Sequence, residues 1–208
     1  RLFRISEQTR SSFDATAEVY TRTALAAKDL GITQQEVLDF TKSLNEAVIL
    51  SGASATEAQA GLIQLSQGLA SGALRGDELR SVLEQLPVVA DVIAQELGVT
   101  RGELRVMGQE GKITADIVLS AFRNAREELS DRFGKSVPTI GQAFTLLRNQ
   151  LVRVVGGFST ASGASSLLAR SIVLLADNME TLLRIAVAGE DEKLVGRGFS
   201  SAVIETAL

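Results

Sequence analysis

The stretch Leu97-Gly98-Val99-Thr100-Arg101-Gly102-Glu103-Leu104 decides the fold, because it carries the end of one helix and the start of the next. Gly98 suits the left-handed residue that often ends a helix. Thr100 and Glu103 match a capping box, in which the hydroxyl accepts from the third helical N–H and the carboxylate accepts from the cap N–H. Val99 and Leu104 stand where a hydrophobic staple closes around such a cap. The stretch therefore predicts a helix, a sharp turn and a second helix.

The same signals recur along the chain. Leu30-Gly31-Ile32-Thr33-Gln34-Gln35-Glu36-Val37 repeats the order of helix stop, staple, cap and helix. We interpret the two copies as independent uses of one connector rather than as a duplication. Ser54 and Glu57 match a third capping box, Gly72 suits another helix end, and Pro87 suits the first turn of a helix.

Apolar residues recur three and four positions apart, which places them on one face of a helix. Ala58, Leu62, Leu65 and Leu69 form one such series, and sustained period-2 alternation is hard to find. The expected fold is all-α: a compact multi-helix globular domain followed by longer helices, with an antiparallel hairpin as one arrangement of the latter.

The composition excludes several classes of function. The 208 residues are 45% hydrophobic but only 4% aromatic with no Trp, so the core must consist mainly of Leu, Val, Ile and Ala. The formal net charge of −4 argues against a uniformly basic nucleic-acid surface. His and Cys are absent, which removes disulfides, thiolate nucleophiles, Ser-His and Cys-His catalytic groups and the usual zinc ligands.

We expect two regions. Residues 1–136 are predicted to form the globular domain, and residues 137–208 the longer helices, with a Gly/Ser hinge near residues 156–163. The chain opens with Arg1 rather than Met, so we expect it to be part of a longer protein. No apolar run reaches the roughly 18–20 residues that a membrane span needs, and none is predicted.

Two narrow apolar stripes in the second region have the spacing of coiled-coil seams. The first consists of Ile140, Phe144, Leu147 and Leu151, and the second of Leu168, Ile172, Leu175, Met179 and Leu182. Such seams close an antiparallel hairpin within one chain or join copies of the chain. Both the hairpin and a homo-oligomer remain open at this point.

A helix-turn-helix DNA-binding regulator is the alternative function. Ala94, Gly98 and Leu104 have the required spacing, but Arg101 is followed closely by Glu103. A recognition helix needs several side chains for base edges and phosphates. The capping pattern explains this connector without a ligand, so nucleic-acid binding is disfavoured.

A carboxylate-only cell-wall hydrolase is a weaker alternative, since a glycosidase needs only two acids. Asp77 and Glu78 are adjacent, so they point to different sides of a helix, and Glu127 and Glu128 do the same. The dense run Glu190-Asp191-Glu192 lacks the alternation of a calcium loop. We therefore predict no enzyme activity, no catalytic, cofactor-binding or metal-binding residues, no cofactor and no small-molecule substrate.

The middle of the chain resembles the N-terminal domain of tape measure proteins of long-tailed phages and prophages, most closely from about residue 44 to residue 122. The positions that carry the resemblance are Ser51, Gly52, Ala53, Leu74, Arg75, Gly76, Asp77, Glu78, Leu79, Glu84, Gln85, Pro87, Gly98, Glu103, Leu104, Gly111 and Lys112.

The resemblance implies a structural role in the phage tail. Tape measure proteins are long helical chains in the tail lumen, whose length sets tail length while the tube polymerises around them. The resemblance also implies that this chain is made in the bacterial host cytoplasm and becomes part of the virion tail. Its expected partners are other tail proteins: the tail tube, the tail tip or assembly chaperones. The resemblance assigns no specific contact residues.

Overall fold

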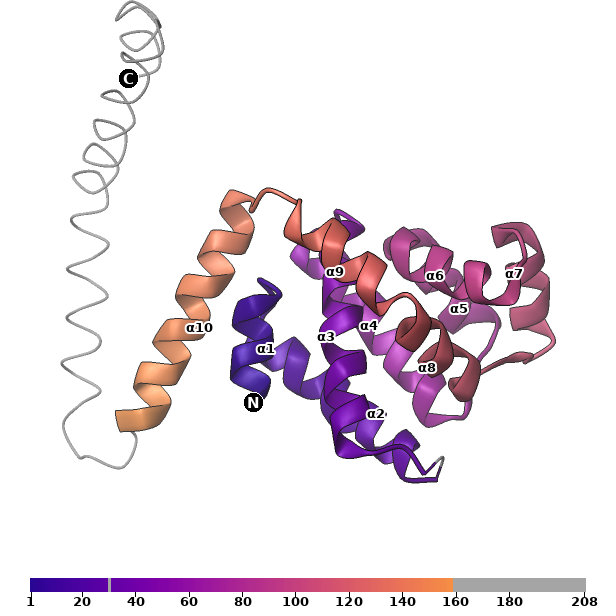
Figure 1. Ribbon diagram of the computed structural model, residues 1–208, viewed down its shortest axis with the longest axis horizontal. Helices are drawn as coiled ribbons and strands as arrows, with labels where there is room; N and C mark the ends of the chain where they lie inside the picture. The colour runs from indigo at the N-terminus through magenta and orange to yellow at the C-terminus, as the bar shows by residue number, and fades with distance from the viewer. Residues whose placement is uncertain (30, 159–208) are drawn as a thin grey trace, which may run out of the picture. The chain divides into compact units, whose positions relative to one another are not determined.

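The computed structural model describes residues 1–29 and 31–158, which are almost entirely helical (Figure 1). The helices are α1 (Leu2–Gln8), α2 (Phe13–Asp29), α3 (Gln34–Leu50), α4 (Ala55–Ala70), α5 (Gly76–Gln85), α6 (Pro87–Leu97), α7 (Arg101–Gln109), α8 (Ala115–Asn124), α9 (Arg126–Gly134) and α10 (Ile140–Phe158). The predicted all-α fold is confirmed.

Contacts divide the chain into a unit of residues Arg1–Leu151 and a unit of residues Val152–Leu208. Of the second unit only residues 152–158 are described, and they are helical. The helix α10 runs through Gly156 and Gly157, and the remainder of the expected hinge lies outside the described residues.

The three predicted capping boxes are present at the starts of α3, α4 and α7. The backbone N–H of Thr100 donates to Glu103 Oε2 at 2.8 Å, and the backbone N–H of Ser54 donates to Glu57 Oε2 at the same distance. Gly98 has a φ of 65°, the left-handed conformation expected after α6. Pro87 is the first residue of α6, where its missing N–H costs no hydrogen bond.

One short sheet interrupts the helices. The strands β1 (Ala73–Leu74) and β2 (Ile113–Thr114) pair antiparallel, with Leu74 opposite Ile113. Alternation cannot be read from two residues, so the sequence pattern did not predict this pairing. It joins two segments that both carry the family resemblance.

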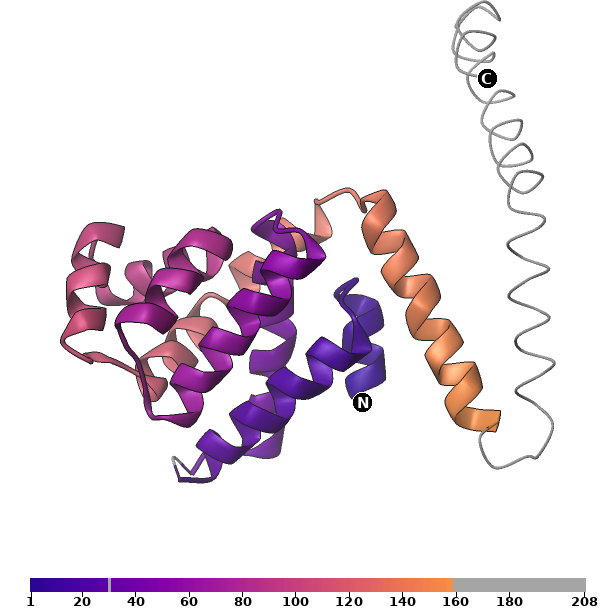
Figure 2. The ribbon, with the colours of Figure 1, turned by 180° about the vertical axis from the view of Figure 1, so that it is seen from behind.

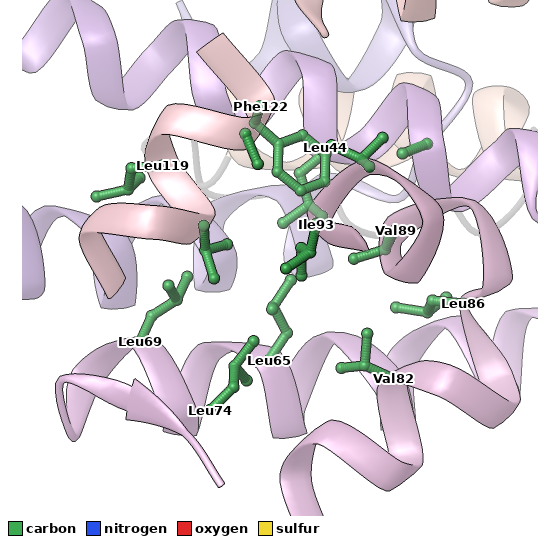
Figure 3. Close-up of a cluster of buried hydrophobic side chains, with 14 of the residues drawn as sticks. Leu44, Leu65, Leu69, Leu74, Val82, Leu86, Val89, Ile93, Leu119 and Phe122 are labelled. Carbon is green, nitrogen blue, oxygen red and sulfur yellow. The ribbon is translucent and has the colours of Figure 1, made fainter. Parts of the chain in front are cut away.

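Helix α3 lies at the centre of the first unit and is buried on nearly all sides. It contacts α1 and α2 on one side and α6, α8 and α9 on the other, while α5 packs on α4 (Figures 1 and 2). Leu44 of α3, Ile93 of α6 and Phe122 of α8 converge in the core (Figure 3). The Phe40 and Phe122 rings meet edge to face, with centroids 5.2 Å apart. As the composition predicts, aliphatic side chains fill most of the core.

Two helical glycines allow close contacts in this core. A Cβ on Gly68 would lie 2.4 Å from Leu74 Cδ2 and 3.2 Å from Leu74 Cα. A Cβ on Gly108 would lie 2.3 Å from Leu79 Cδ2. Glycine therefore lets α4 approach β1, and α7 approach α5, more closely than any side chain would permit.

Candidate functional site

Helix α10 exposes a row of apolar side chains, which is the described half of the predicted seams. Ile140 is 79% exposed, Phe144 57% and Leu147 45%, while Leu151 is half-buried. Contiguous exposed apolar surface often marks an interaction site. We call these four residues the α10 stripe. The second predicted seam, Leu168, Ile172, Leu175, Met179 and Leu182, lies outside the described residues.

Polar contacts attach α10 to the start of α2. Asn149 is 2% exposed, and its Nδ2 donates to the Ser11 carbonyl oxygen at 2.7 Å. Its Oδ1 accepts the backbone N–H of Phe13 at 2.9 Å. The exposed Arg148 forms an ion pair with Asp14 at 3.0 Å. These contacts are polar, and none of the described α10 side chains belongs to the hydrophobic core cluster, so Ile140 and Phe144 remain more than half exposed.

Arg10, between α1 and α2, reaches the junction of α9 and α10. It is only 8% exposed and has a φ of 54°, a left-handed conformation unusual for a residue with a Cβ. Nη2 donates to Ser136 Oγ at 2.6 Å and to the Phe133 carbonyl oxygen at 3.2 Å, and the guanidinium lies 4.1 Å from the Phe133 ring centroid. Nη1 donates to the Ser136 carbonyl oxygen and to Gln142 Oε1, both at 3.3 Å.

A groove of about 690 Å³ lies beside Arg10. Its walls come from the turn before α2, α2 itself, the end of α3, the start of α4, the junction before α10 and the first half of α10. Apolar lining residues include Val48, Ala53, Ala58 and Leu62. Gly52 and Ala53, two positions of the family resemblance, lie in this wall. The volume is within the range of about 300–1,000 Å³ that is typical of binding pockets.

Glu46 of α3 is a buried carboxylate that is not among the residues lining this groove. Its Oε1 lies 3.5 Å from Lys42 Nζ, and its Oε2 has no hydrogen-bond partner among the described residues. Burial raises the pKa of Glu46, an effect that Lys42 opposes. Burial of a carboxylate with an unpaired oxygen destabilises the fold, and Glu46 contributes no atom to the groove.

The connector between α6 and α7 has the geometry of a helix cap. Ala94 and Leu104 are buried, and Gly98 ends α6. Arg101 Nε and Nη2 donate to Asp91 Oδ1 and Oδ2 at 2.6 and 2.7 Å, an arrangement that raises the pKa of Arg101. A guanidinium held in this way by a carboxylate does not favour contact with phosphate, so no observation here supports the DNA-binding alternative.

The acidic residues considered for catalysis lie at helix starts. Asp77 and Glu78 are in the first turn of α5, and Asp77 is 3.5 Å from Arg80 Nη2. Glu127 and Glu128 occupy the first turn of α9. Negative side chains at these positions favour the positive end of the helix dipole. In residues 1–29 and 31–158, no three acidic side chains converge as a metal site would require, and no helix is long and apolar enough to cross a membrane.

The family model described as "Tape measure protein" matches residues 1–160. The chain belongs to the tape measure protein family. Searches among curated proteins and among solved structures found no match. Tape measure proteins are structural phage proteins rather than a family of enzymes, so membership supports a structural role in a phage tail.

The positions that carry the tape measure resemblance serve several structural purposes. Leu74, Leu79 and Leu104 are core residues, and Gly52, Gly98 and Gly111 have positive φ. The remaining positions lie at helix ends and turns. Ser51 and Ala53 follow α3, and Lys112 precedes β2. The start of α5 carries Arg75, Gly76, Asp77 and Glu78, and its end carries Glu84 and Gln85, while Pro87 starts α6 and Glu103 caps α7.

Some residues of this tape measure domain carry contacts that sequence reasoning missed. Ser51 Oγ accepts the backbone N–H of Val88 at 3.1 Å, which joins the end of α3 to α6. Arg10 and Asn149 connect segments more than a hundred residues apart. An isolated Arg or Asn gives no periodic signal, so neither could be distinguished from a surface residue before the fold was known.

Proposed function

We propose that this chain helps to set tail length and supports tail assembly through contacts with the tail tube, the tail tip or assembly chaperones. The observation that carries the proposal is the match to the tape measure family over residues 1–160. Synthesis in the host cytoplasm followed by incorporation into the virion tail belongs to the same proposal. The exposed α10 stripe supports contact with protein as the mode of action.

The tail-length role is tested in a phage or prophage that carries this gene. Helical residues advance the chain by about 1.5 Å each, so an in-frame insertion of about 60 helix-forming residues after residue 186 adds about 90 Å. We expect tails longer by that order in negative-stain electron micrographs. If the lengthened protein is confirmed in the particles but the tails keep their wild-type length, the tail-length role is wrong.

We also propose that residues 1–136 act as the globular head and that residues 137–208 begin the elongated part. The attachment of α10 supports this division, because Asn149 joins it to the start of α2 by hydrogen bonds and none of its described side chains belongs to the core cluster. Limited proteolysis of the whole chain tests it. First cuts between residues 136 and 165 are expected, and first cuts inside residues 44–122 would contradict the division.

We propose further that the α10 stripe joins copies of this chain. The closely spaced row of Ile140, Phe144 and Leu147 fits a seam between helices. Sedimentation at about tens of micromolar should give a mass above that of one chain. Phe144→Glu should restore the mass of one chain, whereas Val106→Glu, at an exposed apolar residue of α7, should not. A wild-type mass of one chain would overturn self-association.

A further inference from the structure

Arg10 is a buried cation without a carboxylate partner among the described residues. The ion pairs of the described chain include Arg148 with Asp14 and Arg22 with Glu18, but none involves Arg10. Buried arginines are normally paired, because removing the charge from water is costly. Within the described part of the chain, the acidic charges at the groove rim are therefore balanced by arginines, while the positive charge of Arg10 is not balanced by a carboxylate.

Arg10 lines the groove together with two of its hydrogen-bond partners, Ser136 and Gln142. Nη1 donates to both of these residues, while Nη2 donates to Ser136 Oγ and to the Phe133 carbonyl oxygen outside the groove. The two Nη1 bonds are 3.3 Å long, while charge-assisted N–H···O bonds are typically about 2.7–2.9 Å. Nη1 is thus the donor that a stronger acceptor in the groove would engage.

Gln142 is a replaceable partner of Arg10. Its Oε1 is shared between Arg10 Nη1 and the backbone N–H of Thr139, both at 3.3 Å. A neutral amide oxygen is a weaker acceptor for a guanidinium than a carboxylate is. Moving this side chain would leave the Nη2 bonds and the Phe133 contact of Arg10 in place.

The rest of the groove suits apolar side chains. Val48 and Leu62 belong to the core cluster, and the half-buried Ala53 and Ala58 pack against it with only a methyl group each. Small side chains leave room for those of a partner. Apolar anchors with one oriented polar contact are how amphipathic helices bind grooves.

We propose that this groove binds an amphipathic peptide segment of another tail protein, whose apolar side chains meet Val48, Ala58 and Leu62 and whose carboxylate replaces Gln142 at Arg10 Nη1. The identity of the partner as a tail protein rests on the proposed function. Charge complementarity selects an acidic segment, because Asp14 and Glu18 already have cationic partners and Arg10 has no anionic partner in residues 1–29 and 31–158.

The test begins with selection of binders from a displayed library of random 16-residue peptides against the 208-residue chain. Selected peptides are synthesised, and their affinities are measured by fluorescence anisotropy. We expect peptides with Asp or Glu beside apolar residues at helical spacing. Changing that acid to its amide should weaken binding about tenfold, as expected for loss of a hydrogen-bonded charge.

Gln142→Glu is the decisive variant, because it supplies Arg10 with a carboxylate from within the chain and does not empty any packed site. Gln142→Glu should weaken binding of the selected peptides about tenfold. In this variant, the affinity should no longer depend on the acidic residue of the peptide. Ala58→Trp fills the groove and should also prevent binding. Gln67→Glu adds the same charge at an exposed residue of α4 outside the groove and should change nothing.

Three results would overturn the proposal: selected peptides that bind Ala58→Trp as well as wild type, peptides insensitive to loss of their acid, or peptides unaffected by Gln142→Glu. Self-association abolished by Ala58→Trp would identify a second copy as the occupant and would also overturn it. Tail length is measured separately, so failure of peptide binding and failure of the tail-length role are distinguishable.

Discussion

Asn149 of α10 accepts the backbone N–H of Phe13 at 2.9 Å and so satisfies the first residue of a distant helix. N–H groups in the first turn of a helix have no partner within that helix. The same amide donates to the Ser11 carbonyl oxygen, and its side chain is shielded from water. A single buried side chain thus joins the beginning of the domain to the helix that carries the exposed apolar stripe.

Replacing this amide should be costly. Asn149→Leu keeps a similar volume but leaves the Phe13 N–H and the Ser11 C=O without a partner, so we expect the free energy of unfolding to fall by about 1–3 kcal/mol. Urea unfolding measures it. Arg148→Ala, which breaks an exposed ion pair one residue away, should cost less than about 1 kcal/mol. Equal effects of the two changes would contradict the role of Asn149.

Adding a methyl group at Gly68 should disturb the contact between α4 and β1. Gly68→Ala places a Cβ against the backbone of Leu74 as well as its side chain, and overpacking of this kind costs about 1–3 kcal/mol. Gly134→Ala is the matched control, because no atom lies within 4 Å of its added Cβ. Thermal unfolding should show a lower midpoint for the first variant and an unchanged or higher one for the second.

The buried carboxylate of Glu46 should make stability depend on pH in an unusual direction. The pKa of Glu46 is raised in the folded chain, so its ionised form destabilises the fold. This destabilisation is complete above the folded pKa and absent below the unfolded pKa. Glu46→Gln should therefore raise the unfolding temperature at pH 8 by more than at pH 4. An equal change at both pH values would show that ionisation is not the cause.

The capping carboxylates should act in the opposite direction. The pKa of Glu103 is lowered, first by the hydrogen bond from the Thr100 backbone N–H and then by that from its hydroxyl. Its contribution is present above the unfolded pKa and is lost as pH falls through the folded pKa. Glu103→Gln should therefore lower stability more at pH 7 than at pH 3, as measured by urea unfolding. A difference between wild type and variant that does not change with pH would contradict this.

The elements of this chain were predictable where their signals are local. Thr100 and Glu103 lie three residues apart, so one capping box could be read without knowing any distant contact. Apolar spacing likewise predicted the buried face of α4, where Leu62, Leu65 and Leu69 belong to the core. The resemblance that led to the tape measure family also depended on a continuous central stretch.

The candidate sites were less predictable, because their members are far apart in the chain. The α10 stripe was expected as a seam, but which side of α10 is exposed depends on how the helix docks, and Asn149 and Arg148 make docking contacts with residues far away in the chain. The groove was not predicted. It joins Arg10, the end of α3 and residues before and within α10, and no spacing rule connects these segments.

The sequence by itself determined where helices start and stop, what fills the core and which family the chain belongs to. The helix ends and the core positions follow from hydrogen bonds and periodicities that span three or four residues, whereas the family follows from the likeness of a long continuous stretch. Only the tertiary structure decided that Arg10 is buried with no carboxylate partner among the described residues, that Glu46 is enclosed and that Ile140, Phe144 and Leu147 are exposed. Burial and pairing of a charge depend on neighbours brought together by folding, and these lie at separations that a linear pattern does not encode.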